Sequence, residues 1–156
     1  EVMQTATRYY RERLKESPDA ISYLKRRGLS GAVAAKFGIG YAPDAWQGLA
    51  TPFADYQSNT LSEIGLVIDN DDGKRYDRFR DRIMFPIVNA RGQIVGFGGR
   101  VLDKGEPKYL NSPETILFDK GHELYGLFQA QKAIRAQQQV VVVEGYMDVV
   151  GLAQHG

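Results

Sequence analysis

The sequence has 156 residues, which suits one domain or a small domain with part of another. Its 20 basic and 19 acidic residues nearly cancel, so any argument for a nucleic-acid partner must rest on where the charges lie. The absence of cysteine excludes a disulfide scaffold and a cysteine-based zinc site, and no apolar run approaches the roughly 18 residues of a membrane span.

The first 38 residues are predicted to form a helical cluster. Apolar residues recur at helical spacing over Val2–Glu16, and Ser17 is a suitable N-cap for a second helix at Asp19–Arg27. Ser30 can cap a third helix that runs to Phe37. The cluster holds eight basic and four acidic residues, which makes it the most positive part of the chain.

A small sheet is predicted to follow. Ile39–Tyr41 reads as a short strand, and Trp46–Tyr56 and Leu61–Leu66 as short helices. Arg82–Val88 and Gln93–Leu102 have the composition and the intervening turn of a β-hairpin. Because proline cannot donate a ladder hydrogen bond, Pro86 predicts a sheet edge or a bulge in the first of these strands.

The last part of the chain is predicted to begin a different fold. A helix at Tyr125–Gln137 precedes an unbroken β-branched run, Val140–Val143, which is typical of a parallel strand buried on both faces. A helix at Tyr146–Gln154 then completes one β–α unit. We therefore expect an N-terminal domain at residues 1–138 and a truncated α/β unit at residues 139–156. Since the chain lacks an initial Met and stops soon after this last helix begins, we expect a piece of a longer protein.

Glu144 is the sharpest chemical signal because it stands at the carboxyl end of the expected parallel strand, where α/β folds place their active sites. Gly145 permits a tight turn into the next helix, so Glu144 could hold a divalent metal or move a proton. Asp148 falls in the first helical turn, where a negative charge favours the helix dipole. The alternative is that Glu144 only ends a strand and Asp148 only caps a helix.

The stretch Lys74–Arg82 interleaves basic and aromatic residues. If it is extended, Arg78, Arg80 and Arg82 point to one side and form a row suited to phosphate oxygens. The alternative is that these arginines pair with nearby aspartates, since basic and acidic residues balance at five each from Asp69 to Arg82.

Further basic residues lie on the glycine-rich strand and on two loops. Gly96–Arg100 continues as a strand and does not open a helix, so it is not a dinucleotide fingerprint; its glycines predict a bulge or a close backbone approach. Bare backbone beside the Arg100 guanidinium would suit a nucleic-acid strand, and the alternative is a solvated arginine on a hairpin. Lys108–Asp119 is predicted to be a surface loop. Lys108 at its start and Lys120 directly after it could act as point charges for a triphosphate, or could simply be solvated. His122 and His155 have no partner at ligand spacing, and we interpret both as non-catalytic.

Taken together, several segments resemble the bacterial replicative DNA primase (DnaG-type) family. They occur in the family's order and cover nearly the whole chain from about residue 20. The matching segments are Tyr23–Ser30, Phe37–Pro43, Tyr76–Pro86, Gly96–Arg100, Pro107–Thr115, Lys120–Gly121, Leu124–Gly126 and Val142–Val149. Gln47–Asp72 does not match visibly and is interpreted as a variable region.

The resemblance implies an α+β fold, in which a helical cluster packs on a small antiparallel or mixed sheet and is followed by the first β–α unit of a Toprim subdomain. It also implies a parent enzyme of the bacterial cytoplasm that copies single-stranded DNA into short RNA primers from ribonucleoside triphosphates. Such an enzyme uses Mg²⁺ or Mn²⁺, holds an RNA–DNA hybrid product, and contacts the replicative helicase through a C-terminal domain that this chain lacks.

The resemblance also assigns residues. It matches Arg27, Arg100 and Lys108 to a template-binding groove, with Arg78, Arg80 and Arg82 lining or supporting it. Lys120 matches a lysine near the incoming nucleotide, and Glu144, with Asp148, matches the Toprim metal motif. The zinc-binding domain and the Asp-x-Asp pair of the family are absent, so we expect this chain alone to be inactive. Two alternatives remain open: another Toprim enzyme, such as a topoisomerase or nuclease, or a non-catalytic single-stranded DNA-binding module.

Overall fold

A computed structural model describes residues 1–156 and has the expected α+β architecture. Three helices open the chain: α1 at Val2–Lys15, α2 at Pro18–Arg26 and α3 at Gly31–Phe37. The caps are as predicted, because the hydroxyl of Ser17 accepts from the Ala20 amide and that of Ser30 from the Val33 amide. None of the chain's helices combines the length and apolarity that a membrane crossing requires.

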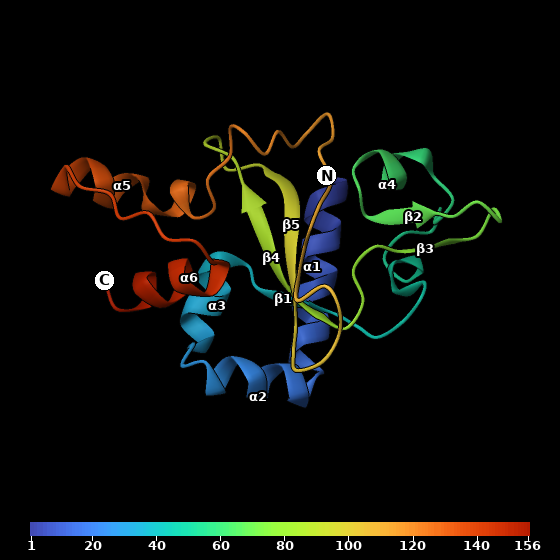
Figure 1. Cartoon of the computed structure of the whole chain (residues 1–156), viewed down its shortest axis with the longest axis horizontal. Coiled ribbons are helices and arrows are strands. Elements are labelled where there is room, and N and C mark those ends of the chain that lie inside the picture. The colour runs from blue at the N-terminus through green and yellow to red at the C-terminus, as the bar shows by residue number, and fades with distance from the viewer.

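The main sheet is antiparallel and has the strand order β1-β4-β5-β6 (Figure 1). The predicted hairpin is confirmed as β4, Arg82–Val88, paired with β5, Ile94–Val101. Strand β1, Gly40–Ala42, pairs only with Arg82–Met84 at the start of β4, so Pro86 lies beyond this pairing, where that side of β4 is an edge. The register between β4 and β5 also shifts after Ile87.

Strand β6, Tyr109–Asn111, is a correction to the sequence interpretation, which treated Lys108–Asp119 as loop throughout. It pairs with Gly98–Arg100 of β5. Only three residues are involved, and two prolines flank them, so no periodic pattern marks the strand. Its pairing brings Lys108 to the end of β5.

A second, smaller unit lies beside the main sheet (Figure 1). Strands β2, Val67–Asp69, and β3, Arg75–Asp77, form its antiparallel pair, next to the 3₁₀ turn η1 and the short helix α4. The turn η1 covers only Gly48–Ala50, much less than the expected helix at Trp46–Tyr56, and α4 covers Asn59–Glu63.

The two faces of the main sheet bury different helices. Helix α1 crosses one face, where Tyr10 meets the edge of Phe97 with ring centroids 5.4 Å apart. On the other face, α2 and α3 pack with Ile83 and Phe85, and the last helix, α6 at Tyr146–Gln154, adds the fully buried Val150 to the same cluster.

The prediction of a buried parallel strand at Val140–Val143 is wrong for this chain. The segment between α5, Leu127–Gln137, and α6 has no regular structure, and Val140, Val141 and Val142 are 61–77% exposed. A buried parallel strand needs hydrogen-bonding neighbours on both edges, and no other strand of this chain reaches the segment. The predicted boundary near residue 138 remains a prediction.

Candidate nucleic-acid interface

The end of α2 and the β5–β6 loop enclose a cavity of about 500 Å³ at one end of the main sheet. Four cationic side chains line it, together with Tyr23 and two acidic residues of the loop. The cations are Arg26 and Arg27 from α2 and its C-cap, Arg100 from β5, and Lys108 from the start of β6. Three of these four are template-groove candidates from the sequence, and the fold brings them together from segments about 80 residues apart.

Arg100 is the most firmly held of the four. Its Nε donates to the Tyr109 hydroxyl at 3.2 Å and its Nη1 to the Val101 carbonyl at 2.5 Å. The guanidinium carbon lies 5.2 Å from the ring centroid of Tyr23 and 5.4 Å from that of Tyr109. No carboxylate pairs with Arg100, so its charge is positioned by neutral groups and is not cancelled.

The other cations of the cavity are exposed. Arg27 also lies over Tyr23, with its guanidinium carbon 5.6 Å from the ring centroid. Arg26 makes the cavity's one ion pair, 3.6 Å from Asp103 of the β5–β6 loop, and both side chains are more than 60% exposed. Four cations against two acids leave the cavity positive, and a positive, partly enclosed site concentrates anionic ligands.

Arg82 does not line the cavity but holds main chain next to it. It is buried, and its Nη1 donates to the carbonyls of Gly99 at 3.3 Å and Lys108 at 3.4 Å. Burial lowers the pKa of Arg82, but no acid partner neutralises it. Arg82 therefore joins β4 to the start of β6 and fixes the main chain that carries Lys108.

The predicted row of Arg78, Arg80 and Arg82 does not form. Residues 78–81 are not a strand, and Asp81 has φ 51°, so the side chains do not alternate as in extended chain. Arg78 donates to the carbonyl of Asn111 at 2.7 and 3.1 Å. Arg80 instead lies 4.1 Å over the exposed ring of Trp46.

Pairing with aspartates, the alternative for these arginines, does not hold for them either. The ion pair of this region belongs to Arg75, whose Nε lies 2.7 Å from Asp69. Asp77 is buried and accepts from the Tyr56 hydroxyl at 2.7 Å and the Leu49 amide at 3.1 Å. Loss of hydration raises the pKa of Asp77 to about 6.

The glycines of β5 allow close approach, as predicted, but the approaching groups are the protein's own side chains. A Cβ built on Gly98 would lie 2.4 Å from the ring of Tyr146, and one on Gly99 would lie 2.9 Å from Phe79. Strand β5 is therefore covered on both faces at this point.

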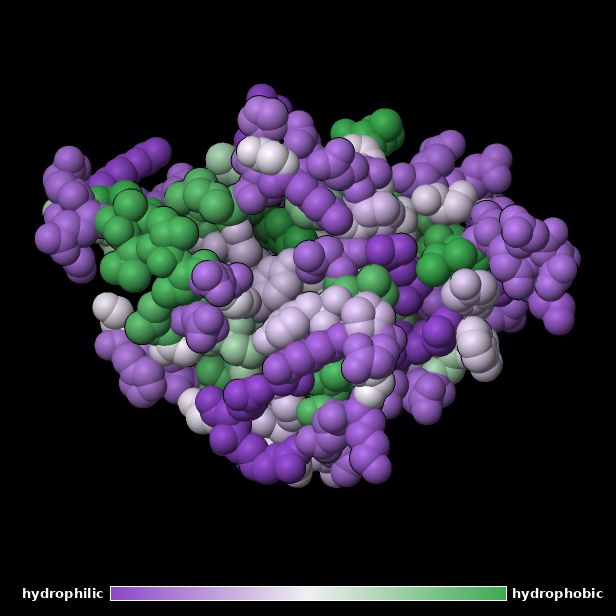
Figure 2. Space-filling view, in the orientation of Figure 1, coloured by the Kyte–Doolittle hydropathy of each residue, from purple (hydrophilic) through white to green (hydrophobic).

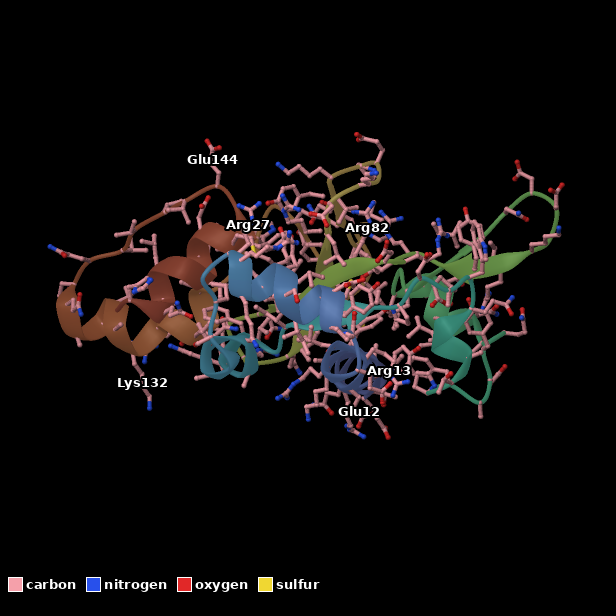
Figure 3. All side chains as sticks on the ribbon, turned by 90° about the horizontal axis from the view of Figure 1, so that it is seen from below. Glu12, Arg13, Arg27, Arg82, Lys132 and Glu144 are labelled. Carbon is pink, nitrogen blue, oxygen red and sulfur yellow. The ribbon has the colours of Figure 1, made fainter.

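Glu144 and Asp148 lie around the start of α6. Glu144 is exposed, and Asp148 accepts from the Gly145 amide at 3.3 Å, which is the capping role that the sequence left open. Figure 3 shows Glu144 projecting on the same side of the molecule as Arg27, whereas Glu12 and Lys132 project on the other. Two carboxylates with free oxygens suit Mg²⁺, which binds one or two acids and completes its shell with water and phosphate. The structure contains no group of three or more acids, histidines or cysteines that could hold a metal ion.

Lys120 is not brought to the cavity. It is exposed on the turn at Asp119–His122, in the connection from β6 to α5 that runs past the opposite end of the main sheet from α2 (Figure 1). Figure 2 shows a hydrophilic band across the face that carries the β5–β6 loop, and an apolar patch over α5 and the segment that follows it. The apolar patch contains the exposed valines that the sequence had placed in a buried strand.

Sequence reasoning missed Tyr23, Tyr109 and the Arg26–Asp103 pair as parts of the cavity. The two tyrosines stand next to recognised residues in the sequence, at the middle of α2 and directly after Lys108. The signal that could have found them is their position inside Tyr23–Ser30 and Pro107–Thr115, two of the segments that resemble the family. The position of Asp103 could not be found, because it depends on how the β5–β6 loop folds back on α2.

Comparison with known proteins identifies the family. A family model described as "DNA primase catalytic core, N-terminal domain" matches residues 9–131. The DNA primase of Neisseria meningitidis is 57% identical over 148 residues, which cover 95% of this chain and 25% of the relative. The DNA primase of Escherichia coli K12 is 47% identical over 160 residues, covering 100% of this chain and 28% of the relative. The chain thus spans about a quarter of these relatives.

Solved structures agree. A DNA primase domain from Pseudomonas aeruginosa superposes with a TM-score of 0.91 at 50% identity, covering 99% of this chain and 50% of that one. A structure described as the DnaG primase catalytic domain bound to ssDNA has a TM-score of 0.88 at 46% identity, covering 97% of this chain and 49% of that one. The chain belongs to the DnaG-type DNA primase family, as the N-terminal domain of its catalytic core.

Proposed function

We propose that this chain holds the single-stranded DNA template of a primase at the cavity between α2 and the β5–β6 loop. The single observation that carries the proposal is the convergence of Arg27, Arg100 and Lys108 on that cavity. Arg100 is fixed there by hydrogen bonds and two aromatic rings but has no acid partner. A guanidinium held in place without a counter-charge is suited to bind phosphate.

The relatives support this proposal. One neighbouring structure is a primase catalytic domain bound to ssDNA, and another is the Mycobacterium tuberculosis primase domain with a double-stranded DNA oligomer that carries a 6-nucleotide overhang. A primase must hold a polyanionic template, and the energy of that contact comes mainly from phosphate neutralisation by Lys and Arg. Binding by this chain should therefore weaken steeply with salt.

In the whole enzyme we assign to this domain a share of RNA primer synthesis from ribonucleoside triphosphates. Glu144 would hold a divalent cation, Mg²⁺ or Mn²⁺, or take the proton of the primer 3′-hydroxyl, with Asp148 as a second carboxylate. The cation, when bound, would offset the negative charge of the reacting phosphates. Lys120 would contact the incoming nucleotide only if the remainder of the enzyme closes over its end of the sheet. Contact with the replicative helicase belongs to a part outside this chain.

Template binding is tested by fluorescence anisotropy of a labelled oligothymidine with this chain at about 0.1 M salt, where screening is moderate. Arg100→Ala is expected to weaken binding about tenfold, and each of Arg100→Ala and Lys108→Ala to lower the slope of log K against log salt by about one. Lys132→Ala is the matched control, because Lys132 projects on the far side (Figure 3). Equal affinities for all three variants would contradict the proposal.

The proposed catalytic role of Glu144 is tested in the complete catalytic core of the enzyme. Glu144→Gln keeps the size of the side chain and removes its charge, so we expect primer synthesis to be abolished and template binding to be unchanged. Unchanged priming would remove Glu144 from the mechanism. A non-catalytic DNA-binding role for the parent protein predicts no primer from either protein.

A further inference from the structure

Tyr146 is the first residue of α6 and stands two positions after Glu144. Its ring stacks on Phe85 of β4, with centroids 5.2 Å apart and planes 9° apart, and meets Tyr125 edge-on at 4.7 Å. The ring fills the space left by the missing side chain of Gly98, where a Cβ would lie 2.4 Å away. The recess bounded by Phe85, Tyr125 and Gly98 thus fits this one side chain, and we call it the seat of Tyr146.

The hydroxyl of Tyr146 makes one specific contact at the rim of that seat. It donates to Oδ1 of Asn111 at 2.7 Å. The main-chain carbonyl of Asn111 accepts both Nε and Nη2 of Arg78. One residue at the end of β6 therefore touches Tyr146 through its side chain and Arg78 through its main chain.

The seat is continuous with the template cavity. Gly98 and Arg100 lie two residues apart on β5 and so share a face of the sheet. The ring of Tyr109 links Tyr146 to Arg100: its centroid lies 6.5 Å from the Tyr146 centroid and 5.4 Å from the guanidinium carbon of Arg100. The aromatic contacts therefore run from the proposed phosphate-binding guanidinium to Tyr146.

Glu144, by contrast, has little else to hold it. Its own side chain makes no hydrogen bond or ion pair, and the six residues before it have no regular structure. Gly145 is held only by residues of α6, because its amide donates to Asp148 and its carbonyl accepts from the Val149 amide. Tyr146 is therefore the first residue after Glu144 whose side chain is fixed to the main sheet.

We propose that Tyr146 is a positioning residue for Glu144, and that its hydrogen bond to Asn111 sets where the carboxylate stands relative to the template cavity. The proposal rests on the catalytic and template-binding roles proposed above. It assigns to Tyr146 no contact with substrate. Packing of the Tyr146 ring stabilises the contact between α6 and the sheet, whereas the hydrogen bond of its hydroxyl fixes the orientation of the residues around Glu144. Removing the hydroxyl alone therefore separates the two contributions.

The experiment compares Tyr146→Phe with Tyr125→Phe in the whole catalytic core. Both variants keep a ring in the same aromatic cluster and remove one hydroxyl, but the Tyr125 hydroxyl is buried without a hydrogen-bond partner, so its loss breaks no contact. For Tyr146→Phe we expect kcat for primer synthesis to fall about fivefold to tenfold, the loss of one hydrogen bond expressed as a rate, while KM and Kd for template stay unchanged. Tyr125→Phe should match the parent enzyme in all three.

A second measurement does not depend on activity. Amide hydrogen exchange of residues 144–148 should be faster in Tyr146→Phe than in the parent, and unchanged in Tyr125→Phe. Asn111→Ala removes the same hydrogen bond from the other side, so its effect on exchange should not add to that of Tyr146→Phe in the double variant.

The outcomes separate the possible roles. Unchanged kcat together with unchanged exchange overturns the proposal, and so does additive exchange in the double variant. A loss of template affinity in Tyr146→Phe would make Tyr146 part of the template surface and would also overturn it, as would a loss of folding in Tyr146→Phe, which would make the hydroxyl a general structural contact. If instead Arg100→Ala binds template normally, the proposed template site fails, while exchange and kcat still decide the role of Tyr146.

Discussion

The cavity end of the main sheet and the β2–β3 unit both contain a buried arginine, but only the arginine of the β2–β3 unit has an acid partner. Arg75 of β3 pairs with Asp69 through two nitrogens and donates from a third to the carbonyls of Tyr56 and Ser58. Arg100 at the cavity contacts only neutral groups. A basic residue whose charge is already matched stabilises the fold, whereas one held without an acid is available to a ligand.

The largest expected effect is on the free energy of unfolding, and it comes from Arg75, the arginine that is paired with an acid. Arg75→Ala leaves the buried carbonyl of Tyr56 and the half-buried carbonyl of Ser58 without their charged donor, and it should lower the free energy of unfolding by about 2–3 kcal/mol. Its template affinity, measured where the variant is still folded, should be unchanged. Urea denaturation and anisotropy on the same samples check both statements, with Lys74→Ala, an exposed neighbour, as the control. A variant that loses DNA binding without losing stability would reverse the roles of the two arginines.

The second prediction concerns the buried acid of the same unit. Asp77 has a pKa of about 6 in the folded protein because burial removes its hydration, and this effect exceeds that of its hydrogen bonds. An unfolded Asp has a pKa near 3.9, so the folded state binds the proton more tightly. Stability from this group should therefore rise as pH falls through 6, by about 1 kcal/mol between pH 7 and pH 5.

The measurement is the free energy of unfolding across that range for the parent and for Asp77→Asn. The variant removes the titrating group, so the difference between the two proteins should change with pH in the stated direction. A pH-independent difference would mean that Asp77 is ionised throughout. Asp77 does not line the cavity, so template affinity should show no matching step over the same range.

The smallest expected effect lies at the cavity, where one acid does face a cation. The Arg26–Asp103 pair is exposed and 3.6 Å long, so it adds little to stability. Asp103→Asn should free Arg26 for phosphate and tighten template binding about twofold at low salt, an effect that salt should erase. Glu106→Gln, on the same loop but without an ion pair, provides the comparison. Weaker binding in Asp103→Asn would mean that the pair shapes the loop and does not compete with template.

The local parts of the fold were predictable from the sequence because neighbouring residues decide them. Ser17 and Ser30 cap their helices through contacts three residues away, and the β4–β5 hairpin follows from strand-forming composition on both sides of one turn. The family resemblance named Arg27, Arg100 and Lys108 together, although nothing local in the sequence relates them. Their convergence needs the pairing of β6 with β5 and the position of α2.

The tertiary structure decided the rest, since it depends on contacts between distant segments. Arg78, Arg80 and Arg82 look equivalent in sequence but separate, because the fully buried Phe79 and the turn at Asp81 direct the backbone between them. Val140–Val143 has the composition of a buried strand but no neighbouring strand, and composition cannot supply one. The sequence by itself determined which elements and which charged residues exist; only the packing of those elements determined which charges are matched and which are left for a ligand.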